Sequence, residues 1–398
     1  MKQLFSRIAI ALSRRLAKLP HLFRRKAWLA FFLGFSFAIA TGNPATSYPQ
    51  PSLASELRGV WLTNIDSEVL FSKASTDKAI KTLAQLNFNT VYPTVWNWGY
   101  TLYPSQVARR VTGQSLDPTP GLQGRDMLEE IIKQGHQQGI AVIPWFEFGF
   151  MAPADSELAR RHPEWLTQRQ DGSRIWWEGN VHQRVWLNPL HPEVQQFITD
   201  LVVEIASNYE VDGIQFDDHL GFPSDFGYDR FTVQLYQQEH GGELPPTDSQ
   251  DSGWVRWRAD KITDYMQRLC TAIRQANPKI LVSLSPNPQK FSLESYLLDW
   301  QTWRQMGLIQ ELVLQVYRNN LGDFIGELEQ PEVKAALDRI PVGIGILSGL
   351  KGHPVSLEQI QRQVQAVRDR RFSGVSFFFY ESLWNLGAET PQARQSTF

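Results

Sequence analysis

The sequence predicts a (β/α)8 barrel, in which eight parallel strands alternate with helices. Three observations support this fold class. From Leu57 onward, apolar runs typical of strands alternate with amphipathic helical stretches. Several of these runs alternate polar and apolar positions, as barrel strands do when one face lines the lumen. No Gly-rich phosphate-binding turn follows any run, which disfavours the alternative of a doubly wound sheet. We therefore expect a single barrel domain over residues 57–398.

The expected elements follow one another along the whole domain. The expected strands are residues 57–64, 89–96, 140–147, 211–219, 280–285, 311–317, 340–347 and 374–380. The expected helices are residues 75–86, 125–138, 191–209, 254–276, 293–306, 322–338 and 357–371. The chain ends soon after the eighth strand, so the last helix should be missing or short. The connection 148–189 after strand three is too long for a simple barrel loop, which indicates a functional loop or lid.

The first 40 residues are predicted to be a signal peptide or a membrane anchor. Arg and Lys residues precede the uncharged apolar run Ala27–Ala40, and Ala38-Ile39-Ala40 offers a small-residue cleavage site. The run is shorter than the roughly 20 residues that a spanning helix needs, which favours export. Residues 41–56 are a Pro/Ser/Thr-rich linker. We expect a periplasmic or other extracytoplasmic protein, anchored to the inner membrane if the segment is not cleaved.

The composition limits the kinds of partner. The formal net charge is −2, so no basic surface indicates nucleic acid as a partner. Aromatic residues make up 12% of the chain and include 14 Trp. Trp rings fill protein cores, but flat apolar rings beside polar groups also bind the faces of sugars. Composition leaves both interpretations open.

The alternation within the strands predicts that the upper lumen of the barrel is polar. In strand four, Gln215 and Asp217 share one face, and in strand six Gln315 and Tyr317 do the same. An unpaired polar side chain under the helix layer would cost several kcal/mol, so these residues should face the lumen. In barrel enzymes the chemistry lies at the carboxyl ends of the strands. The polar positions therefore predict a site at that end.

Strand four ends in two carboxylates and a histidine. Asp217 turns toward the lumen at the carboxyl end of the strand, which makes it the first catalytic candidate, with a loop-capping role as the alternative. Asp218 is a catalytic candidate, a partner of Asp217 or a structural cap. His219 beside two carboxylates suggests a metal, but neighbouring residues on a strand point apart and no other ligand cluster has metal-like spacing. We expect His219 to contact substrate, with no metal and no cofactor.

The second carboxylate has two candidates. Glu147 ends strand three in a strongly apolar stretch, an environment that raises a carboxyl pKa and suits a general acid. Its alternative role is a structural Glu paired with an Arg. Glu381 follows strand eight and could serve instead. Two carboxyl groups across one polar site are the minimum for glycoside hydrolysis.

Aromatic and polar side chains near the strand ends are the substrate-binding candidates. They are Trp61, Asn64, Trp96, Trp145, Gln215, His219, Gln315, Tyr317 and Tyr380. The long connection adds Trp residues that would form a sugar-stacking cleft if they were exposed above the barrel mouth.

Four segments resemble the glycosyl-hydrolase-like family 10. They are ELRGVW at 56–61, HPEWL at 162–166, LNP at 187–189 and the motif at 211–219, and the resemblance covers roughly residues 56–385. It implies a barrel related to retaining amylase-type glycosidases, whose nucleophile is the Asp of a strand-four Asp-Gly motif, here Asp217. The amylase-type Arg two residues earlier is Gln215 here. The amylase-type acid after strand five has no carboxylate counterpart at 285–287, which leaves Glu147 or Glu381. Some members of the family are linked to cleavage of peptidoglycan glycan strands.

The leading hypothesis is an exported glycosidase that cleaves a polysaccharide, with cell-wall glycan as the favoured substrate. The first alternative is a non-catalytic carbohydrate-binding barrel, because the strand-five acid is missing. The second is a metal-dependent polysaccharide deacetylase.

Overall fold

The computed structural model describes residues 56–398. The expected signal peptide or anchor and nearly all of the expected linker lie outside the described residues. Within 56–398, none of the helices is both long enough and apolar enough to cross a membrane.

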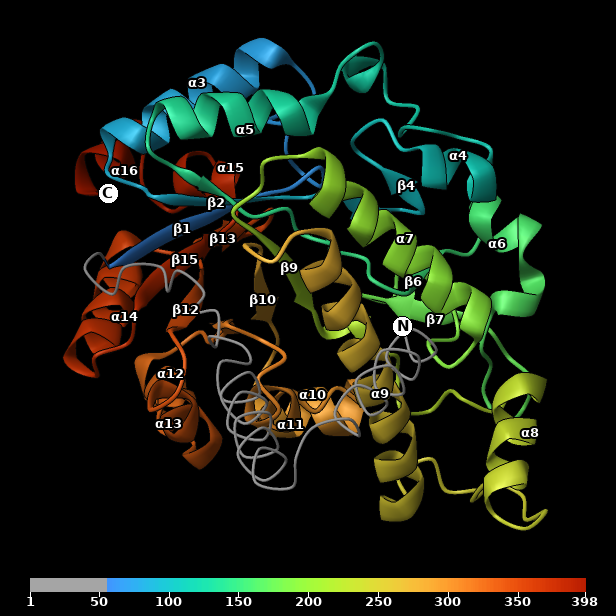
Figure 1. The fold of residues 1–398 in the computed structure, drawn as a ribbon. Helices are drawn as coiled ribbons and strands as arrows, with labels where there is room; N and C mark the ends of the chain where they lie inside the picture. The colour runs from blue at the N-terminus through green and yellow to red at the C-terminus, as the bar shows by residue number, and fades with distance from the viewer. Residues whose placement is uncertain (1–55) are drawn as a thin grey trace, which may run out of the picture. The chain divides into compact units, whose positions relative to one another are not determined.

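Eight parallel strands form the central sheet, and the two edges of that sheet meet. The strand order is β5-β2-β1-β15-β12-β11-β10-β9. At the edges, Gln215 N donates to Pro144 O (2.8 Å) and Phe146 N donates to Gln215 O (2.9 Å). Trp145 pairs in parallel with both Thr94 and Gln215. These bonds close the sheet, and helices surround it (Figure 1), so the predicted (β/α)8 barrel is confirmed.

All eight expected strands are present, but the third is much shorter than expected, because only Ala141–Val142 of residues 140–147 form the strand and Glu147 lies in the turn that follows. The barrel strands are β1 (Leu57–Leu62), β2 (Thr90–Pro93), β5 (Ala141–Val142), β9 (Gly213–Asp217), β10 (Leu281–Ser285), β11 (Glu311–Gln315), β12 (Val342–Leu347) and β15 (Gly374–Phe378). The helices of the barrel layer are α3 (Lys73–Gln85), α5 (Met127–Gln137), α7 (Pro192–Asn208), α9 (Ser252–Ala276), α10 (Gln289–Tyr296), α11 (Trp300–Gln305), α12 (Leu321–Leu328), α13 (Pro331–Leu337), α14 (Leu357–Asp369), α15 (Tyr380–Trp384) and α16 (Pro391–Thr397).

Two expected helices are each split into a pair. The expected helix 293–306 is α10 and α11, because Leu297 takes a left-handed conformation (φ 59°) and Asp299 caps the start of α11. The expected helix 322–338 is α12 and α13, because Pro331 cannot continue a helix but suits the first position of a new one. After strand eight the chain forms only the short helices α15 and α16, as the sequence indicates.

The strand-four motif is shorter as a strand than the sequence suggests. β9 ends at Asp217, and Asp218–Leu220 form the 3-10 turn η3. The Asp217 carboxylate caps this turn by accepting a hydrogen bond from His219 N (2.9 Å). The strand alternation therefore stops before Asp218 and His219, and their side chains are directed by the turn.

A cluster of mainly aromatic side chains fills the barrel lumen below the strand ends. It comprises Trp61, Tyr92, Ile143, Trp145, Val313 and Phe379. Trp61 stacks on Tyr92 with ring centroids 5.4 Å apart. Glycines make room for these rings: a Cβ on Gly345 would lie 3.2 Å from Trp61, and one on Gly59 would lie 3.0 Å from Tyr92. The opposite strand faces, such as Ile214 and Phe216 of β9, belong to the core under the helices.

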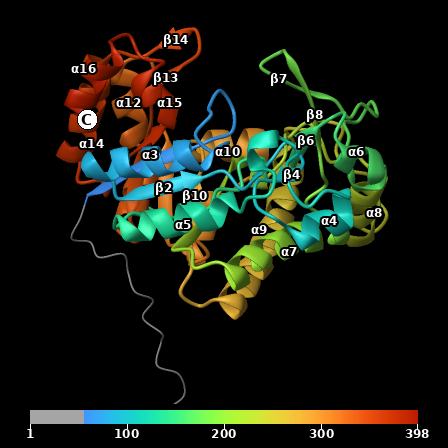
Figure 2. The ribbon, with the colours of Figure 1, turned by 90° about the horizontal axis from the view of Figure 1, so that it is seen from above.

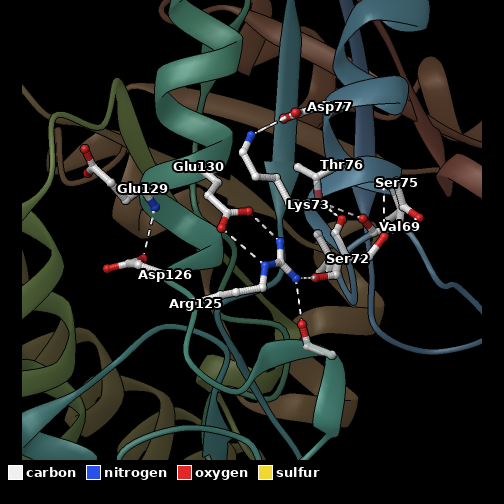
Figure 3. A network of polar contacts seen from close by, with 12 residues as sticks. Val69, Ser72, Lys73, Ser75, Thr76, Asp77, Arg125, Asp126, Glu129 and Glu130 are labelled. Carbon is white, nitrogen blue, oxygen red and sulfur yellow. Dashed lines mark hydrogen bonds and ion pairs between the residues drawn. The ribbon is translucent and has the colours of Figure 1, made fainter.

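Polar contacts link the segment that enters α3 to the segment that enters α5 (Figure 3). Arg125 donates to Leu70 O (3.2 Å) and Gly121 O (2.7 Å), and it pairs with Glu130 (2.5 Å). Thr76 Oγ1 donates to Val69 O (2.9 Å). The segment that leaves β1 is thereby fixed before it enters α3.

The connections at the carboxyl ends of the strands carry additional structure. The connection after β2 forms the short β3 (Trp96–Asn97) and β4 (Tyr100–Thr101) and the helix α4 (Gln106–Thr112). The connection 148–189 forms β6 (Met151–Pro153), α6 (Glu157–Arg161), β7 (Trp176–Glu178) and β8 (His182–Trp186), and the three strands pair antiparallel. The segment after β9 carries α8 (Arg230–Glu239), and the segment after β12 forms the β13 (Gly349–Leu350) and β14 (His353–Pro354) hairpin. Figure 2 shows the β7 and β14 hairpins projecting from the same side of the barrel.

Arg394 fixes the C-terminal helices to the barrel. Its guanidinium is fully buried and pairs with Glu389 (2.9 Å). The same group donates to the carbonyl oxygens of Ser348, Val355, Ser382 and Leu383.

Replacing Arg394 should therefore strongly destabilise the domain. Arg394→Ala leaves these buried carbonyl groups without a donor, and we expect the free energy of unfolding to fall by about 3 kcal/mol or more. Urea unfolding followed by circular dichroism measures the change. Arg362→Ala is the control, because Arg362 pairs with Glu358 on an exposed helix face, a pair worth about 0.5 kcal/mol. Equal effects of the two substitutions would contradict the assignment.

Candidate active site

Glu147 lies buried at the carboxyl end of the barrel. Its Oε2 atom accepts hydrogen bonds from Asn97 Nδ2 (2.8 Å), Thr94 Oγ1 (3.0 Å) and Thr63 Oγ1 (3.4 Å). The side chain follows the third strand, and its donors follow the first and second, so three neighbouring strands position one carboxyl group. Glu147 accepts no bond from an Arg in the described chain, so its partners are neutral donors.

The surroundings of Glu147 favour its protonated form. Burial raises the pKa of Glu147 to about 7, the hydrogen bond from Thr94 opposes that rise, and the negative charge of Asp217 adds to it. A carboxyl group with this pKa holds a proton near neutral pH and can release it during a reaction.

Asp217 sits at the end of β9, and donors face both of its oxygen atoms. Oδ1 accepts from His219 N (2.9 Å) and contacts His219 Nδ1 (3.0 Å), while Oδ2 accepts from Trp145 Nε1 (3.1 Å). These donors stabilise negative charge on the carboxylate. Because Trp145 pairs in register with Gln215, Glu147 and Asp217 each lie two residues beyond that pair along their own segments of chain. The two carboxyl groups therefore share the barrel mouth.

His219 supplies positive charge beside Asp217. Burial by itself would lower the pKa of His219, but the charge and hydrogen bond of Asp217 outweigh it and raise the pKa to about 9. The imidazole ring stacks on Trp186, with ring centroids 5.7 Å apart. Its backbone oxygen accepts from Phe150 N (2.8 Å), which fixes the residue against the connection after β5. The ring is thus held between Trp186 and the carboxylate of Asp217.

Other substrate-binding candidates lie around the two carboxyl groups. Asn64 Oδ1 accepts from Asn97 Nδ2 (2.8 Å), which also contacts Glu147. Tyr317 is half-buried just beyond the end of β11. Burial raises the pKa of Tyr317 well above its usual value, and the negative charges of Asp217 and Glu147 add to the rise. Its hydroxyl has no hydrogen-bond partner in the described chain.

Three candidates lie deeper in the lumen or beside it. Trp61 Nε1 donates to Gln215 Oε1 (2.7 Å), and both side chains are buried below the carboxyl groups. Gln315 Nε2 donates to Ser285 O (2.7 Å). Trp61 and Gln215 therefore form the floor of the site.

Asp218 points away from Glu147. Its Oδ2 atom accepts from Asn287 N (2.8 Å) and Asn287 Nδ2 (2.6 Å), and its Oδ1 atom accepts from Ser292 Oγ (2.5 Å). Burial raises its pKa, and the hydrogen bonds from Ser292 and Asn287 oppose the rise. The geometry agrees with the cap among its three expected roles, since Asp218 ties the turn after β9 to the segment after β10.

Glu381 and Tyr380 lie in a different pocket from Glu147 and Asp217. Both line a pocket of about 350 Å³ between α3, α15 and α16, together with Lys78 of α3. Burial raises the pKa of Glu381, and a hydrogen bond from Ser67 opposes the rise. Of the two expected acids, the structure brings only Glu147 beside Asp217.

The Trp residues divide between packing and exposed positions. Trp96 is fully buried, donates to Gly149 O (2.9 Å) and packs on Phe197, so it lies in the core instead of the mouth. Trp98 and Trp177 are exposed to 41% and 51% on connections that follow β2 and β5. Exposed Trp rings at a barrel mouth are suited to stacking on sugars.

Sequence reasoning missed Thr63 and Asn97 as partners of Glu147. Thr63 follows the first strand directly, and strand alternation, which puts it on the same face as Trp61, would have found it. Asn97 lies in the separate strand β3, so strand alternation gives no signal for it.

The barrel, with its buried acid and paired carboxylate at the mouth, defines a glycosidase-like (β/α)8 protein. The sequence model of the family described as "Glycosyl hydrolase-like 10" matches residues 56–366, and the chain belongs to this family. It is 25% identical over 321 residues to "Glycosyl hydrolase DigH" of Escherichia coli (strain K12), covering 69% of each chain. It is 23% identical over 299 residues to "Glycosyl hydrolase YngK" of Bacillus subtilis (strain 168), covering 66% of this chain and 54% of the relative.

Solved structures share the fold. The glycoside hydrolase domain of PgaB (BpsB) from Bordetella bronchiseptica superposes with a TM-score of 0.61 at 14% identity, over 81% of this chain and 94% of that domain. The catalytic domain of β-amylase from Paenibacillus polymyxa gives a TM-score of 0.59 at 11% identity, over 86% of this chain and 96% of that domain. At these identities the likeness shows the barrel fold alone.

The raised pKa of Glu147 should appear in the pH dependence of stability. The folded protein binds this proton more tightly than the unfolded chain, so the associated stability is present below pH 4.5 and is lost as pH rises to about 7. Glu147→Gln lacks this titrating group. The difference in free energy of unfolding between Glu147→Gln and the unchanged protein should therefore shift in favour of the variant by up to about 3 kcal/mol from acidic pH to about pH 8.

Urea unfolding of both proteins at several pH values measures this difference. Glu358→Gln is the control, since this side chain is exposed to 72% on α14. A constant difference between Glu147→Gln and the unchanged protein across the pH range would show that Glu147 is not held protonated.

Proposed function

We propose that this protein is a glycoside hydrolase in which Glu147 is the general acid and Asp217 is the carboxylate that attacks the anomeric carbon or activates water. The observation that carries the proposal is the pairing of opposite environments at one mouth: Glu147 is buried among neutral donors, whereas Asp217 contacts His219. Such a separation of proton affinities assigns the acid and the base in two-carboxylate enzymes.

The proposed division of labour follows from the contacts. Protonated Glu147 donates its proton to the leaving glycosidic oxygen as the bond to the anomeric carbon breaks. His219 and Trp145 hold the two oxygen atoms of Asp217, which orients this carboxylate at the mouth. The unpartnered Tyr317 hydroxyl lies near both acids and is available to bind a substrate hydroxyl.

We further propose that the substrate is a cell-wall glycan strand outside the cytoplasm. The N-terminal segment predicts export, and the resemblance to family members linked to peptidoglycan glycan strands supports this class of substrate. Exposed Trp98 and Trp177 on the mouth connections are suited to a long polysaccharide.

A non-catalytic carbohydrate-binding barrel is the alternative that the missing strand-five acid favours. In our proposal Glu147, which follows the third barrel strand, replaces the missing strand-five acid near Asp217. The two hypotheses differ in one measurement: incubation with purified glycan strands releases new reducing ends only if the protein is a hydrolase. For the deacetylase hypothesis, no group of three or more His, Cys, Asp or Glu in residues 56–398 is arranged to hold a metal.

Substitution of the two acids should abolish cleavage without unfolding the barrel. We expect Asp217→Asn to lower kcat by at least about 10³-fold and Glu147→Gln by about 10²–10⁴-fold. The assay counts reducing ends released from peptide-free glycan strands, and circular dichroism verifies the fold. Glu381→Gln tests the other acid candidate and should leave the rate close to that of the unchanged protein. Full activity of Asp217→Asn would refute the proposed site.

The pH profile of cleavage should report the proton on Glu147. We expect kcat/KM to fall as pH rises above about 7, because the general acid loses its proton there. Thr94→Val removes a hydrogen bond that favours the charged carboxylate of Glu147. The fall of kcat/KM, the alkaline limb of the pH profile, should therefore move to higher pH. Thr63→Val is the control with the longer contact of 3.4 Å, and it should move the limb less. An unmoved limb in Thr94→Val would assign the titration to another group.

A further inference from the structure

A second hollow opens beside the candidate active site. It lies between the β7 hairpin, the segment after β9 and helix α10, and its volume is about 410 Å³. Trp176, Phe291 and Tyr296 give it apolar walls, while Asp225, Gln250 and Glu294 give it polar groups. We call this hollow the lateral pocket.

The lateral pocket shares a wall with the reaction centre. The Tyr296 ring stands edge-on to His219 with centroids 6.2 Å apart, and His219 contacts Asp217. On the other side, Trp176 packs on Trp186, which stacks on His219. The pocket therefore begins one ring away from the residue that holds Asp217.

Backbone contacts form the walls of the lateral pocket. Phe222 N donates to Tyr296 O (3.0 Å) and Ser224 N donates to Ser295 O (2.9 Å), so the segment after β9 runs along the end of α10. The buried Arg258 donates to Ser224 O (2.6 Å) from below this segment. A site whose walls are fixed before binding loses little entropy when a ligand enters.

Phe291 separates the lateral pocket from another hollow next to it. That hollow has a volume of about 460 Å³ and is also lined by Phe291 and Glu294, with Lys290 and Arg318 beyond them. The Phe291 ring is 48% exposed, so it forms an apolar ridge between two polar-lined spaces. Flat rings with acceptors and donors beside them match a sugar ring, which has apolar faces and a hydroxyl-bearing edge.

We propose that the lateral pocket is a binding subsite for a sugar residue of the polymer beyond those at the scissile bond, with the sugar stacked on Phe291 and Trp176. The inference rests on the proposed glycosidase function and adds a preference for long substrates. Binding energy gained at the pocket lowers the barrier at Asp217 and Glu147 only for chains that reach it.

The test compares two substrate lengths. The probes are peptide-free peptidoglycan glycan tetrasaccharides and strands of roughly ten sugars or more. Phe291→Ala should lower kcat/KM about tenfold or more on long strands, the loss expected for one aromatic stacking contact, and should leave tetrasaccharide cleavage unchanged.

Two further variants control for damage to the fold. Phe291→Tyr keeps the ring and should restore cleavage of long strands. Met306→Ala removes a side chain of similar exposure, 45%, at the end of α11 and outside both hollows, and should change neither rate. Equal losses on both lengths, or no loss with Phe291→Ala, would overturn the subsite.

A binding measurement separates failure of the subsite from failure of the proposed function. Calorimetry with the Asp217→Asn variant and long strands measures affinity without cleavage. Weaker binding of Asp217→Asn/Phe291→Ala supports the subsite even if the unchanged protein releases no reducing ends, in which case only the hydrolase assignment fails. Equal affinity of the two variants refutes the subsite independently of catalysis.

Discussion

Two carboxyl groups are buried at one barrel mouth, and desolvation makes it unfavourable for both to carry charge. The aromatic cluster around Trp61 and Trp145 fills the lumen below them and keeps water out. The protein meets this constraint asymmetrically: Glu147 receives only neutral donors, while Asp217 receives the imidazole of His219. Burial raises the pKa of Glu147 for this reason, and the proposed role of Glu147 as the acid follows from that rise.

The source of positive charge distinguishes this site from the amylase-type arrangement that the sequence resembles. There an Arg precedes the nucleophile by two residues on the same strand. Here Gln215 occupies that position, and its amide accepts a hydrogen bond from Trp61 Nε1 and donates one to Ser283 Oγ. Ser283 in turn donates to the buried Glu311 (2.6 Å), so the polar chain continues downward, away from the mouth. The cation beside Asp217 comes instead from the turn after the strand, where His219 lies.

The sequence predicts the barrel well because apolar strand-like runs recur eight times between helical stretches, and it placed Asp217 through the polar–apolar alternation within strand four. It predicts less where a strand has ended. Asp218 turns toward Asn287 and Ser292 because η3 begins there, and Glu381 faces α3 because it lies in the first turn of α15. Neither direction can be derived from a period of two residues. Trp96 shows the same limit, because composition alone does not distinguish a core Trp from a binding Trp.

The connection after β5 joins catalysis and substrate choice in one segment. It starts just beyond Glu147, and Phe150 N then holds the His219 carbonyl, an approach that a side chain at Gly149 would prevent because its Cβ would lie 2.2 Å from that oxygen. Further on, the same segment carries Trp176 into the lateral pocket. A change in this connection that reshapes the pocket therefore also moves His219, and with it the charge balance at Asp217. Substrate length and acid–base chemistry are coupled through one piece of chain, so the pocket cannot be altered independently of the two carboxyl groups except at side chains such as Phe291, which belong to α10.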